Sequence, residues 1–379
     1  MNENDPIYLD HNATTPLLPE VVDAMLPYLR EHFGNPSSGH VYGARARAAV
    51  ATARERVAAL LGCDEDEILF TSGGTEANNL AIRGVVATLE SRRIVTTVVE
   101  HPATARPCAW LEKHGWRVTR VGVDADGRAR VDEASNAIKS DTSLVTVMHS
   151  NNETGVLQPV AELAEIARGV GAIVHTDAAQ SLGKVPVRVR ELGVDLLSVA
   201  GHKLYAPKGV GALYVKRGTP LAPFVLGAGH ERGMRPGTEN VASIVGLGVA
   251  CEAVGRDMQA VSTRMRRQCD MLWELLAQAI PGLALNGHRS MRLPNTLNVR
   301  FPRATGDAVL AGAPEVAAST GSACHEGQES ASAVILAMGV APKDALGSVR
   351  LTLGRGTTDD DVLRAADVLV RSWKSVVRG

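Results

Sequence analysis

The sequence predicts an α/β fold with a large, mainly parallel sheet and a second, smaller α+β domain. From residue 21 to about residue 215, helical stretches alternate with short β-branched runs, the pattern of parallel strands joined by crossover helices. Most of these runs are almost continuously apolar, as expected for strands covered on both faces. After a long helical stretch around Val249 to Ile280, the sequence changes to short strands and a C-terminal helix, which indicates the second domain.

Local signals predict the individual elements. Ala44 to Leu61 is rich in Ala and Arg, and Gly62 can close this helix in a left-handed conformation. The strands predicted in the large sheet are Ile94–Val99, Leu144–Met148, Ile173–Thr176, Leu196–Val199 and Gly211–Val215. In the second domain we expect a strand at Thr296–Phe301 and a helix from Thr358. We divide the chain into a large domain at 16–250 and a small domain formed by 1–15 and 251–379.

Composition and charge exclude several classes of protein. The 379 residues include 40 basic and 41 acidic side chains, and aromatic residues make up only 3%. Without a basic surface or stacking aromatics, direct binding of nucleic acid is not expected. The longest apolar uncharged run, Asn240 to Cys251, is too short for a membrane helix, and the acidic N-terminus does not resemble a signal peptide. We therefore expect a cytoplasmic protein without membrane contact.

Chemistry is expected where polar residues follow the apolar strands, because open parallel sheets bind ligands beyond the carboxyl ends of their strands. Five segments have this character: Thr71–Asn79, Glu100–His101, Ser150–Gly155, His175–Gln180 and Ala200–Lys203. In the first, Ser72-Gly73-Gly74-Thr75 opens a predicted helix, so its backbone N–H groups could hold a phosphate. The segment lacks the Lys of a P-loop and the glycine spacing of a dinucleotide site. An ordinary capped turn is an equally good interpretation.

Two charged residues at strand ends suggest a cofactor. Asp177 could cap the next helix or pair with a buried cation. Lys203 could be a solvated loop residue, or partial burial could lower its pKa and make it a nucleophile. A phosphate cradle, a strand-end acid and a nucleophilic lysine together meet the needs of pyridoxal phosphate. His101 could offer a flat face to the pyridine ring, although a strand-end His is more often a hydrogen-bonded turn residue.

The sequence resembles the cysteine desulfurase and selenocysteine lyase family over nearly its whole length. The segments that carry the resemblance occur in the family's order: Tyr8–Pro16, Thr71–Asn79, Glu100–His101, Asn151–Gly155, His175–Gln180, Gly201–Lys203, Arg235–Asn240, Gly321–Cys324 and Arg350–Leu353. The resemblance implies a fold type I, class V aminotransferase-like homodimer with a seven-stranded, mainly parallel sheet. It also implies pyridoxal 5'-phosphate as cofactor and removal of sulfur from L-cysteine, or selenium from L-selenocysteine, to leave L-alanine.

The family's functional residues can be assigned to this sequence one by one. By resemblance, Lys203 forms the Schiff base with the cofactor, His101 stacks on its ring, and Asp177 pairs with the ring nitrogen. Gln180 donates a hydrogen bond to the phenolic oxygen of the cofactor. The residues implied to bind the phosphate are Gly74, Thr75 and His202, together with Thr238 from the other subunit. Lys203 would also move protons, and His101 would help to deprotonate the substrate thiol. Asn152 and Arg350 would bind the substrate carboxylate, a planar anion that a guanidinium can hold with two hydrogen bonds.

Cys324 is the candidate sulfur carrier. Five cysteines, odd in number and without a Cys-x-x-Cys pair, argue against a disulfide framework or a zinc knuckle. Ser319–Gln328 is small and polar and predicts a mobile loop, whereas buried structural positions suit the other four cysteines, Cys63, Cys108, Cys251 and Cys269, better. By resemblance, the Cys324 thiolate takes the substrate sulfur as a persulfide and passes it to a scaffold or carrier protein. His325 beside it could favour the thiolate.

Other functions stay open on the sequence. Ala200 stands where many desulfurases have a phosphate-binding Ser, and nearby Ser198 could replace that hydroxyl. This departure and the Cys-His pair also resemble the selenocysteine lyases. An aminotransferase or β-lyase of the same fold would not need the Cys324 thiol, and a non-catalytic docking subunit would not need Lys203 and Asp177. The sulfur could supply iron–sulfur assembly, tRNA thiolation or DNA phosphorothioation.

Overall fold

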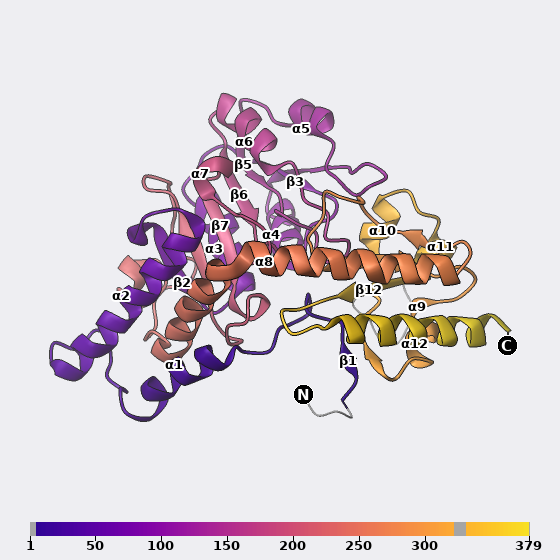
Figure 1. Cartoon of the computed structure of the whole chain (residues 1–379). Coiled ribbons are helices and arrows are strands. Elements are labelled where there is room, and N and C mark those ends of the chain that lie inside the picture. Colours follow the sequence, from indigo (N-terminus) through magenta and orange to yellow (C-terminus); the bar gives the residue numbers. More distant parts are fainter. Residues whose placement is uncertain (1–4, 322–330, 379) are drawn as a thin grey trace.

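A seven-stranded sheet forms the centre of the protein, whose computed structural model describes residues 5–321 and 331–378 (Figure 1). In spatial order its strands are β2 (Ile68–Thr71), β8 (Gly211–Val215), β7 (Leu196–Ala200), β6 (Ile173–Asp177), β5 (Thr142–Thr146), β3 (Arg93–Thr97) and β4 (Arg117–Val121). All neighbouring strands are parallel except that β8 is antiparallel to β2 and β7. The predicted mainly parallel α/β fold is confirmed.

Three strands of the large sheet differ from the sequence prediction. β2 was not among the predicted strands, although it is buried along its whole length. β8 has the predicted bounds, but its inclusion in a series of parallel strands is wrong. Only residues 201–210 separate it from β7, too few for the crossover that a parallel partner needs. β4 was not predicted, because it is an edge strand with exposed Arg117 and Arg120 and has no continuous apolar run. The other strand ends differ from the prediction by one or two residues.

Helices cover both faces of the sheet. On this part of the chain they are α1 (Pro19–Arg30), α2 (Val41–Leu61), α3 (Gly74–Val86), α4 (Pro102–Lys113), α5 (Val131–Ala137), α6 (Val160–Gly169) and α7 (Val189–Leu192), with the 3₁₀ turns η1 (Glu65–Glu67), η2 (Gly201–Lys203) and η3 (Glu231–Gly233). Successive strand residues point to opposite faces. Leu196 therefore belongs to the core under α3 and α4, and Leu197 belongs to the core under α2 and α6. Burial on both faces explains the continuous apolar runs.

The long helix α8 (Val241–Ala279) begins well before the predicted start near residue 249. Asn240 caps it, because the Asn240 side chain accepts a hydrogen bond from Ser243 N. The glycines that had interrupted the apolar pattern permit close helix packing: a Cβ on Gly248 would come within 2.6 Å of the Ala53 Cα on α2. Gly62, at φ 73°, ends α2 as predicted.

A three-stranded antiparallel sheet lies near the C-terminal half of α8, away from the seven-stranded sheet (Figure 1). Its strands, in spatial order, are β12 (Ser348–Thr352), β10 (Thr296–Arg300) and β9 (Ala284–Leu285). The other elements here are α9 (Gly306–Ala311), α10 (Ala333–Ala337), α11 (Pro342–Ala345), α12 (Asp359–Arg378), and the paired short strands β1 (Ile7–Tyr8) and β11 (Val316–Ala317). The predicted strand and C-terminal helix of the second domain are both present.

α8 contributes to two separate cores. Leu247 packs with the seven-stranded sheet, and Leu272 packs with the three-stranded sheet and α12. Between them Asp257 leaves the helical conformation, with φ −131° and ψ 17°. The division at 250/251 falls inside this helix and stays a prediction. Among the described residues, no helix is long and apolar enough to cross a membrane.

Candidate active site

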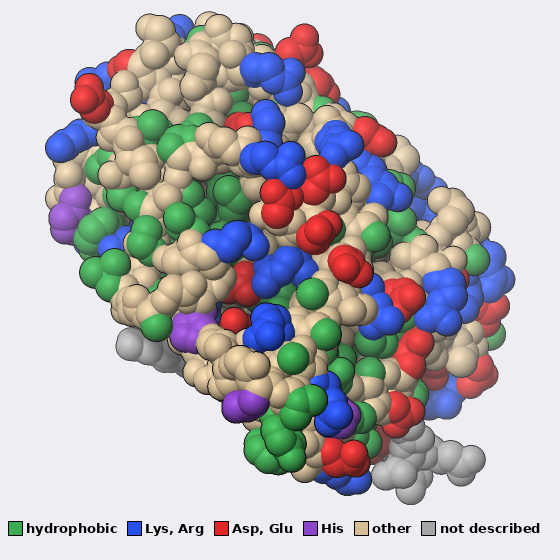
Figure 2. All heavy atoms as spheres, turned by 90° about the vertical axis from the view of Figure 1, so that its left-hand side faces the viewer, with side chains coloured by type: hydrophobic (Ala, Val, Ile, Leu, Met, Phe, Trp, Pro, Cys, Tyr) green, Lys and Arg blue, Asp and Glu red, His purple; other side chains and the backbone are tan. Residues whose placement is uncertain are grey.

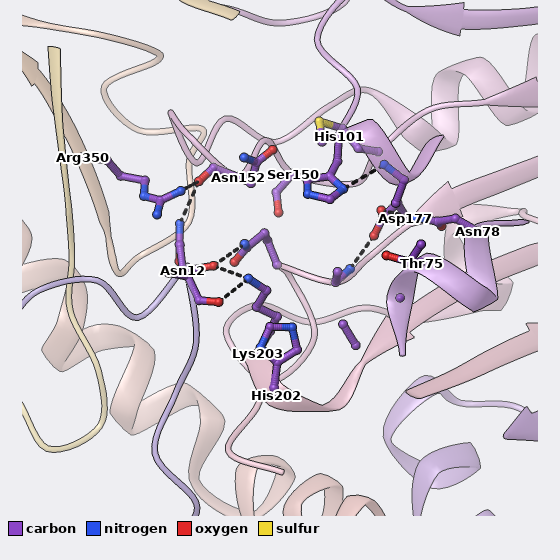
Figure 3. A pocket seen from close by; sticks show the side chains of 17 residues that line it. Asn12, Thr75, Asn78, His101, Ser150, Asn152, Asp177, His202, Lys203 and Arg350 are labelled. Carbon is purple, nitrogen blue, oxygen red and sulfur yellow. Dashed lines mark hydrogen bonds between the residues drawn. The ribbon is translucent and has the colours of Figure 1, made fainter. Parts of the chain in front are cut away.

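A cavity of about 300 Å³ lies at the carboxyl ends of the parallel strands (Figure 3). Nine residues expected from the sequence line it: Gly74, Thr75, His101, Asn152, Asp177, Gln180, His202, Lys203 and Arg350. They come from the starts of α3 and α4, the segments after β5, β6 and β7, and from within β12. Thr238 is exposed and does not line this cavity, and Cys324 lies outside the described residues.

Asp177 ends β6 and is held rigidly at the cavity wall. It is 7% exposed, and its carboxylate accepts hydrogen bonds from Asn78 Nδ2 at 2.6 Å and Ala179 N at 2.9 Å. The second bond is the turn-capping contact that the sequence allowed, so capping and a cavity position are compatible. Asn78 had no predicted role, although it lies in the glycine-rich segment. Its Oδ1 has no partner within the described part of the chain, which leaves an acceptor beside Asp177.

Lys203 is not a solvated loop residue. It lies in η2 after β7, and its Nζ donates to the carbonyl oxygens of Asn12 and Ala13, both at 2.6 Å (Figure 3). Burial lowers the pKa of Lys203 to about 8, helped by the positive charge of Arg350 and opposed by Asp10 and Asp177. A substantial neutral fraction of this amine is therefore available near pH 8, as a nucleophile requires.

His101 combines the two interpretations that the sequence left open. It caps α4, and its Nδ1 accepts the backbone N–H of Ala103 at 3.1 Å. The ring nevertheless lines the cavity from an exposed position at its mouth. Because Nδ1 is an acceptor, a neutral ring carries its proton on Nε2. Desolvation lowers the pKa of His101 from its ordinary value, with an opposing effect of Asp177 and a further lowering by Lys203.

The glycine-rich segment has the geometry of an anion site. Gly73, at φ 145°, precedes the first residue of α3, and a Cβ on Gly74 would come within 3.2 Å of the Ala200 methyl group. Gly73 and Gly74 add no side chain at the start of α3, and Gly74 and Thr75 line the cavity, so the N-terminus of this helix faces it. His202 lies beside it, with Nδ1 3.2 Å from Thr14 Oγ1. Burial and nearby lysines, Lys203 first, lower the pKa of His202 to about 4, so its ring is neutral.

Ser198 does not replace the hydroxyl missing at Ala200. It is fully buried, and its Oγ lies 3.0 Å from Nε2 of His175 on β6. Ala200 lines the cavity and Ser198 does not. The suggestion that Ser198 could serve as the phosphate hydroxyl is wrong for this reason.

The positively charged side chain of Arg350, on β12 of the small sheet, lines the cavity. One terminal nitrogen donates to Asp10 Oδ1 at 2.7 Å and Ser319 Oγ at 2.9 Å, and the other donates to the Asn152 carbonyl at 3.0 Å. The guanidinium is therefore fixed by the protein itself, and its buried Nε makes no hydrogen bond within the described residues. Asn152 contributes its backbone carbonyl as well as the expected side chain at the cavity wall.

Asn12 is the site residue that sequence reasoning missed most clearly. It is 1% exposed, and its carbonyl accepts both Lys203 Nζ and Gln180 Nε2, the latter at 2.9 Å. Its side chain donates to Thr296 Oγ1 on β10 at 3.0 Å, and its N–H donates to Thr352 Oγ1 on β12. The segment Tyr8–Pro16 had been singled out, but nothing local in it indicates these distant partners.

The described cysteines have the character of buried structural residues. Cys108, Cys251 and Cys269 are at most 1% exposed, and Cys63 is half-buried. In each case burial raises the pKa of the thiol to about 12. None of these four is a thiolate at neutral pH, which agrees with the sequence interpretation. Within the described residues, no cluster of His, Cys, Asp and Glu could hold a metal ion.

The arrangement fits pyridoxal 5'-phosphate. An open helix N-terminus beside a neutral His suits a phosphate, a rigid strand-end carboxylate suits a ring nitrogen, and a lysine with lowered pKa suits an aldehyde carbon. The unpaired Nε of Arg350 adds a donor for the carboxylate of an amino acid. These groups surround one cavity, so the residues present fit the cofactor that the sequence indicated.

Comparison with known proteins gives the same assignment. Residues 7–364 match the model of the family described as Aminotransferase class-V, and the chain belongs to that family. The chain is 45% identical over 369 residues to Cysteine desulfurase IscS of Dictyoglomus turgidum, covering 96% of this chain and 94% of the relative. Within the class-V aminotransferases, it is thus a pyridoxal-phosphate-dependent enzyme of the cysteine desulfurase family.

Solved structures agree with the sequence relatives. A structure described as a NifS-like protein has a TM-score of 0.91 and 34% identity, and the match covers 97% of this chain and 98% of that chain. A structure described as SspA in complex with cysteine has a TM-score of 0.81 and 34% identity, covering 91% of this chain and 98% of that chain. The fold is therefore that of the NifS-like enzymes, as the sequence predicted.

Proposed function

We propose that this enzyme is a cysteine desulfurase that converts L-cysteine to L-alanine and carries the released sulfur on Cys324 as a persulfide. The observation that carries the proposal is the meeting of Asp177, Lys203 and Arg350 around one cavity of amino-acid size. The family relationship supports the same reaction. In atoms, L-cysteine and the Cys324 thiol become L-alanine and a Cys324 persulfide, so no oxidant or reductant is consumed.

Each residue of the cavity has a separate role in the proposed reaction. When bound, pyridoxal 5'-phosphate supplies an electron sink for bond cleavage in the amino acid. Asp177 holds the ring nitrogen, and the amine of Lys203 binds the cofactor and moves protons at the substrate carbon atoms. Arg350 binds the substrate carboxylate through donors that Asp10 and Ser319 leave free. His101 offers Nε2 at the cavity mouth, where it can exchange a proton with the substrate thiol.

Product analysis tests the proposal. Purified protein and its Cys324→Ala variant are each given L-cysteine and L-selenocysteine, and alanine and sulfide are quantified. We expect alanine from both substrates in the parent, with the cysteine reaction alone lost in the variant. Full cysteine activity in Cys324→Ala would remove Cys324 from the mechanism. Alanine from L-selenocysteine only would make the protein a selenocysteine lyase.

The proposal includes a homodimer. Several large apolar side chains are exposed at the α1 and α2 end of the chain, including Leu29 at 63%, Phe33 at 76% and Val41 at 65%. Figure 2 shows that hydrophobic side chains group on this face, with charged groups mostly to one side. Large apolar side chains gathered on one exposed face are typical of a protein–protein interface. Thr238, exposed and outside the cavity of its own chain, is free to reach the partner's phosphate site.

Subunit mixing tests both the dimer and the role of Thr238. Thr238→Ala should weaken cofactor binding in its own homodimer, and Lys203→Ala should abolish activity. In a mixed dimer of these two variants, one site combines Lys203 of one chain with Thr238 of the other. We expect that site to regain parental cofactor affinity. Absence of this recovery would show that Thr238 acts within its own chain or not at all, and a monomer in sedimentation would contradict the dimer.

The acceptor and the compartment complete the proposal. We propose that the persulfide sulfur goes to a scaffold or carrier protein in the cytoplasm. Transfer of radiolabelled sulfur from L-cysteine to copurifying proteins, with Cys324→Ser as control, tests the acceptor role. Label that stays on the enzyme or appears only as free sulfide would contradict it, and cell fractionation tests the compartment.

A further inference from the structure

A second buried lysine lies behind the cavity, and the proposed function gives it no task. Lys184 is 4% exposed, and its Nζ donates to Gln180 Oε1 at 3.0 Å and to Asn12 Oδ1 at 3.3 Å. Both partners are neutral amide oxygens. Burying an ammonium group among neutral acceptors costs free energy. We therefore ask which role the hydrogen bonds of Lys184 fulfil. Burial, with the charges of Lys203 and Arg350, lowers the pKa of Lys184 to about 7.

Lys184 determines which end of the Gln180 amide is presented to the cavity. Gln180 is 6% exposed and lines the cavity, with Nε2 donating to the Asn12 carbonyl at 2.9 Å. The ammonium form of Lys184 can only donate, so it pairs with an amide oxygen and not with an amide NH₂. A flipped Gln180 would place its NH₂ against Lys184 and its oxygen against the Asn12 carbonyl, losing both bonds. Lys184 therefore fixes Nε2 as a donor, with one N–H beyond the one given to Asn12.

Lys184 also holds Asn12, whose backbone carbonyl accepts a hydrogen bond from Lys203. Asn12 binds Lys184 through its side-chain oxygen and Lys203 through its backbone carbonyl. Asn295 Nδ2 donates to the same side-chain oxygen at 3.1 Å. The side-chain oxygen of Asn12 thus accepts hydrogen bonds from Lys184 and from Asn295. These bonds hold Asn12 in place, and with it the backbone carbonyl to which Lys203 Nζ donates.

We propose that Lys184 is a positioning residue for the cofactor pocket: it orients the Gln180 amide so that Nε2 donates into the pocket, and it anchors Asn12 beneath Lys203. It acts without touching the cofactor. The inference rests on the proposed assignment of this pocket to pyridoxal 5'-phosphate, and it goes further by explaining why the pocket presents a donor at Gln180 and not an acceptor.

A double-mutant cycle on the full-length protein, stripped of cofactor and retitrated with pyridoxal 5'-phosphate, tests the inference. Binding is followed by tryptophan fluorescence and by the absorbance of the bound cofactor. We expect Lys184→Met to weaken binding about 10-fold and to shift the absorbance maximum, because one oriented hydrogen bond is lost. Gln180→Ala should weaken binding to a similar extent. In the Gln180→Ala background, Lys184→Met should weaken binding by less than about 2-fold more. Lys216→Met, which removes an exposed lysine paired with Asp195, is the matched control.

Each alternative outcome has a defined meaning. Parental affinity and absorbance in Lys184→Met would overturn the inference, as would fold-changes that multiply in the double variant, because Lys184 would then not act through Gln180. If Lys184→Met does not fold, Lys184→Gln takes its place in the cycle with the same criteria. Failure of the parent protein to bind pyridoxal 5'-phosphate would instead reject the proposed function.

Discussion

The two sheets contribute to the cavity in opposite ways. The seven-stranded sheet supplies residues at the ends of its strands or just after them, such as Asp177 and Lys203. The three-stranded sheet supplies Arg350 from the middle of β12, where its side chain is 8% exposed. A strand-end residue is positioned by the local chain. Arg350 is positioned by contacts with Asp10 and Asn152, which are distant in sequence.

Because they are positioned differently, Lys203 contributes to the chemistry alone, whereas Arg350 contributes to both the chemistry and the stability. Lys203 is bound by backbone carbonyls that remain in place whatever side chain stands at position 203. Arg350 neutralises Asp10 and connects the N-terminal segment to the region around Asn152, besides offering Nε to a substrate. We therefore expect substitution of Lys203 to affect mainly the chemistry, and substitution of Arg350 to affect both chemistry and stability.

The largest effect is expected for Lys203→Ala. Loss of the amine removes cofactor attachment and proton transfer together, so alanine formation should fall by at least ~10³-fold. Far-UV circular dichroism of the cofactor-free variant should stay close to that of the parent, which shows that the fold is kept. Retention of more than a tenth of the activity would show that Lys203 is not the essential amine.

Arg350→Ala should separate the two tasks of that residue. We expect the KM for L-cysteine to rise about 30- to 160-fold, because a charge-assisted hydrogen bond contributes roughly 2 to 3 kcal/mol. The unfolding free energy should also fall, because Asp10 loses its cation. Asp10→Asn added to Arg350→Ala should recover stability without recovering KM. Recovery of both, or of neither, would contradict the separation.

A matched pair of core substitutions tests whether the two sheets are separate folding units. Leu197 and Leu351 are both 0% exposed, in different cores, and replacement by Ala should lower stability by about 2 to 5 kcal/mol in each case. We expect amide hydrogen exchange to rise around β6 to β8 in Leu197→Ala and around β10 and β12 in Leu351→Ala. Equal increases in both regions in both variants would indicate one cooperative unit joined through α8, and no division near residue 250.

Two lysines at the cavity, the buried Lys184 and the half-buried Lys203, should make stability rise with pH. The pKa values are about 7 for Lys184 and about 8 for Lys203 in the folded protein, below the ordinary 10.5 of an exposed lysine. Between these values and 10.5 the unfolded chain binds more protons, so unfolding free energy increases with pH, and this contribution is lost as pH falls through 8 and then 7. Each group adds a slope of at most about 1.4 kcal/mol per pH unit.

Urea unfolding of the cofactor-free protein from pH 7.5 to 9.5 measures this effect. Lys184→Met should give a shallower dependence on pH than the parent, whereas Lys216→Met should not change it. An unchanged slope in Lys184→Met would mean that Lys184 is as readily protonated in the folded chain as in the unfolded one.

The smallest effect is expected for the described cysteines. Cys63→Ala should change alanine formation by less than about 2-fold, because the Cys63 thiol is half-buried and burial raises its pKa to about 12. Alkylation with iodoacetamide at pH 8, followed by peptide mass analysis, should label Cys324 far ahead of Cys63. Preferential labelling of Cys63 would contradict this assignment.

The sequence by itself determined the elements and the residues at the strand ends. Strand β8, the left-handed end of α2 at Gly62, and the positions of Asp177, His101 and Lys203 follow from patterns a few residues long. Such patterns are readable because a strand buried on both faces must be apolar throughout and a helix must end at a residue that allows it.

The tertiary structure alone decided the direction of β8, the burial of Ser198, and the network of Asn12, Gln180 and Lys184. Hydrogen bonds of Asn12 reach Lys184, Thr296 and Thr352, so no local pattern encodes them. A buried polar side chain must find partners wherever the fold brings them, and these partners come from segments that are far apart in the sequence.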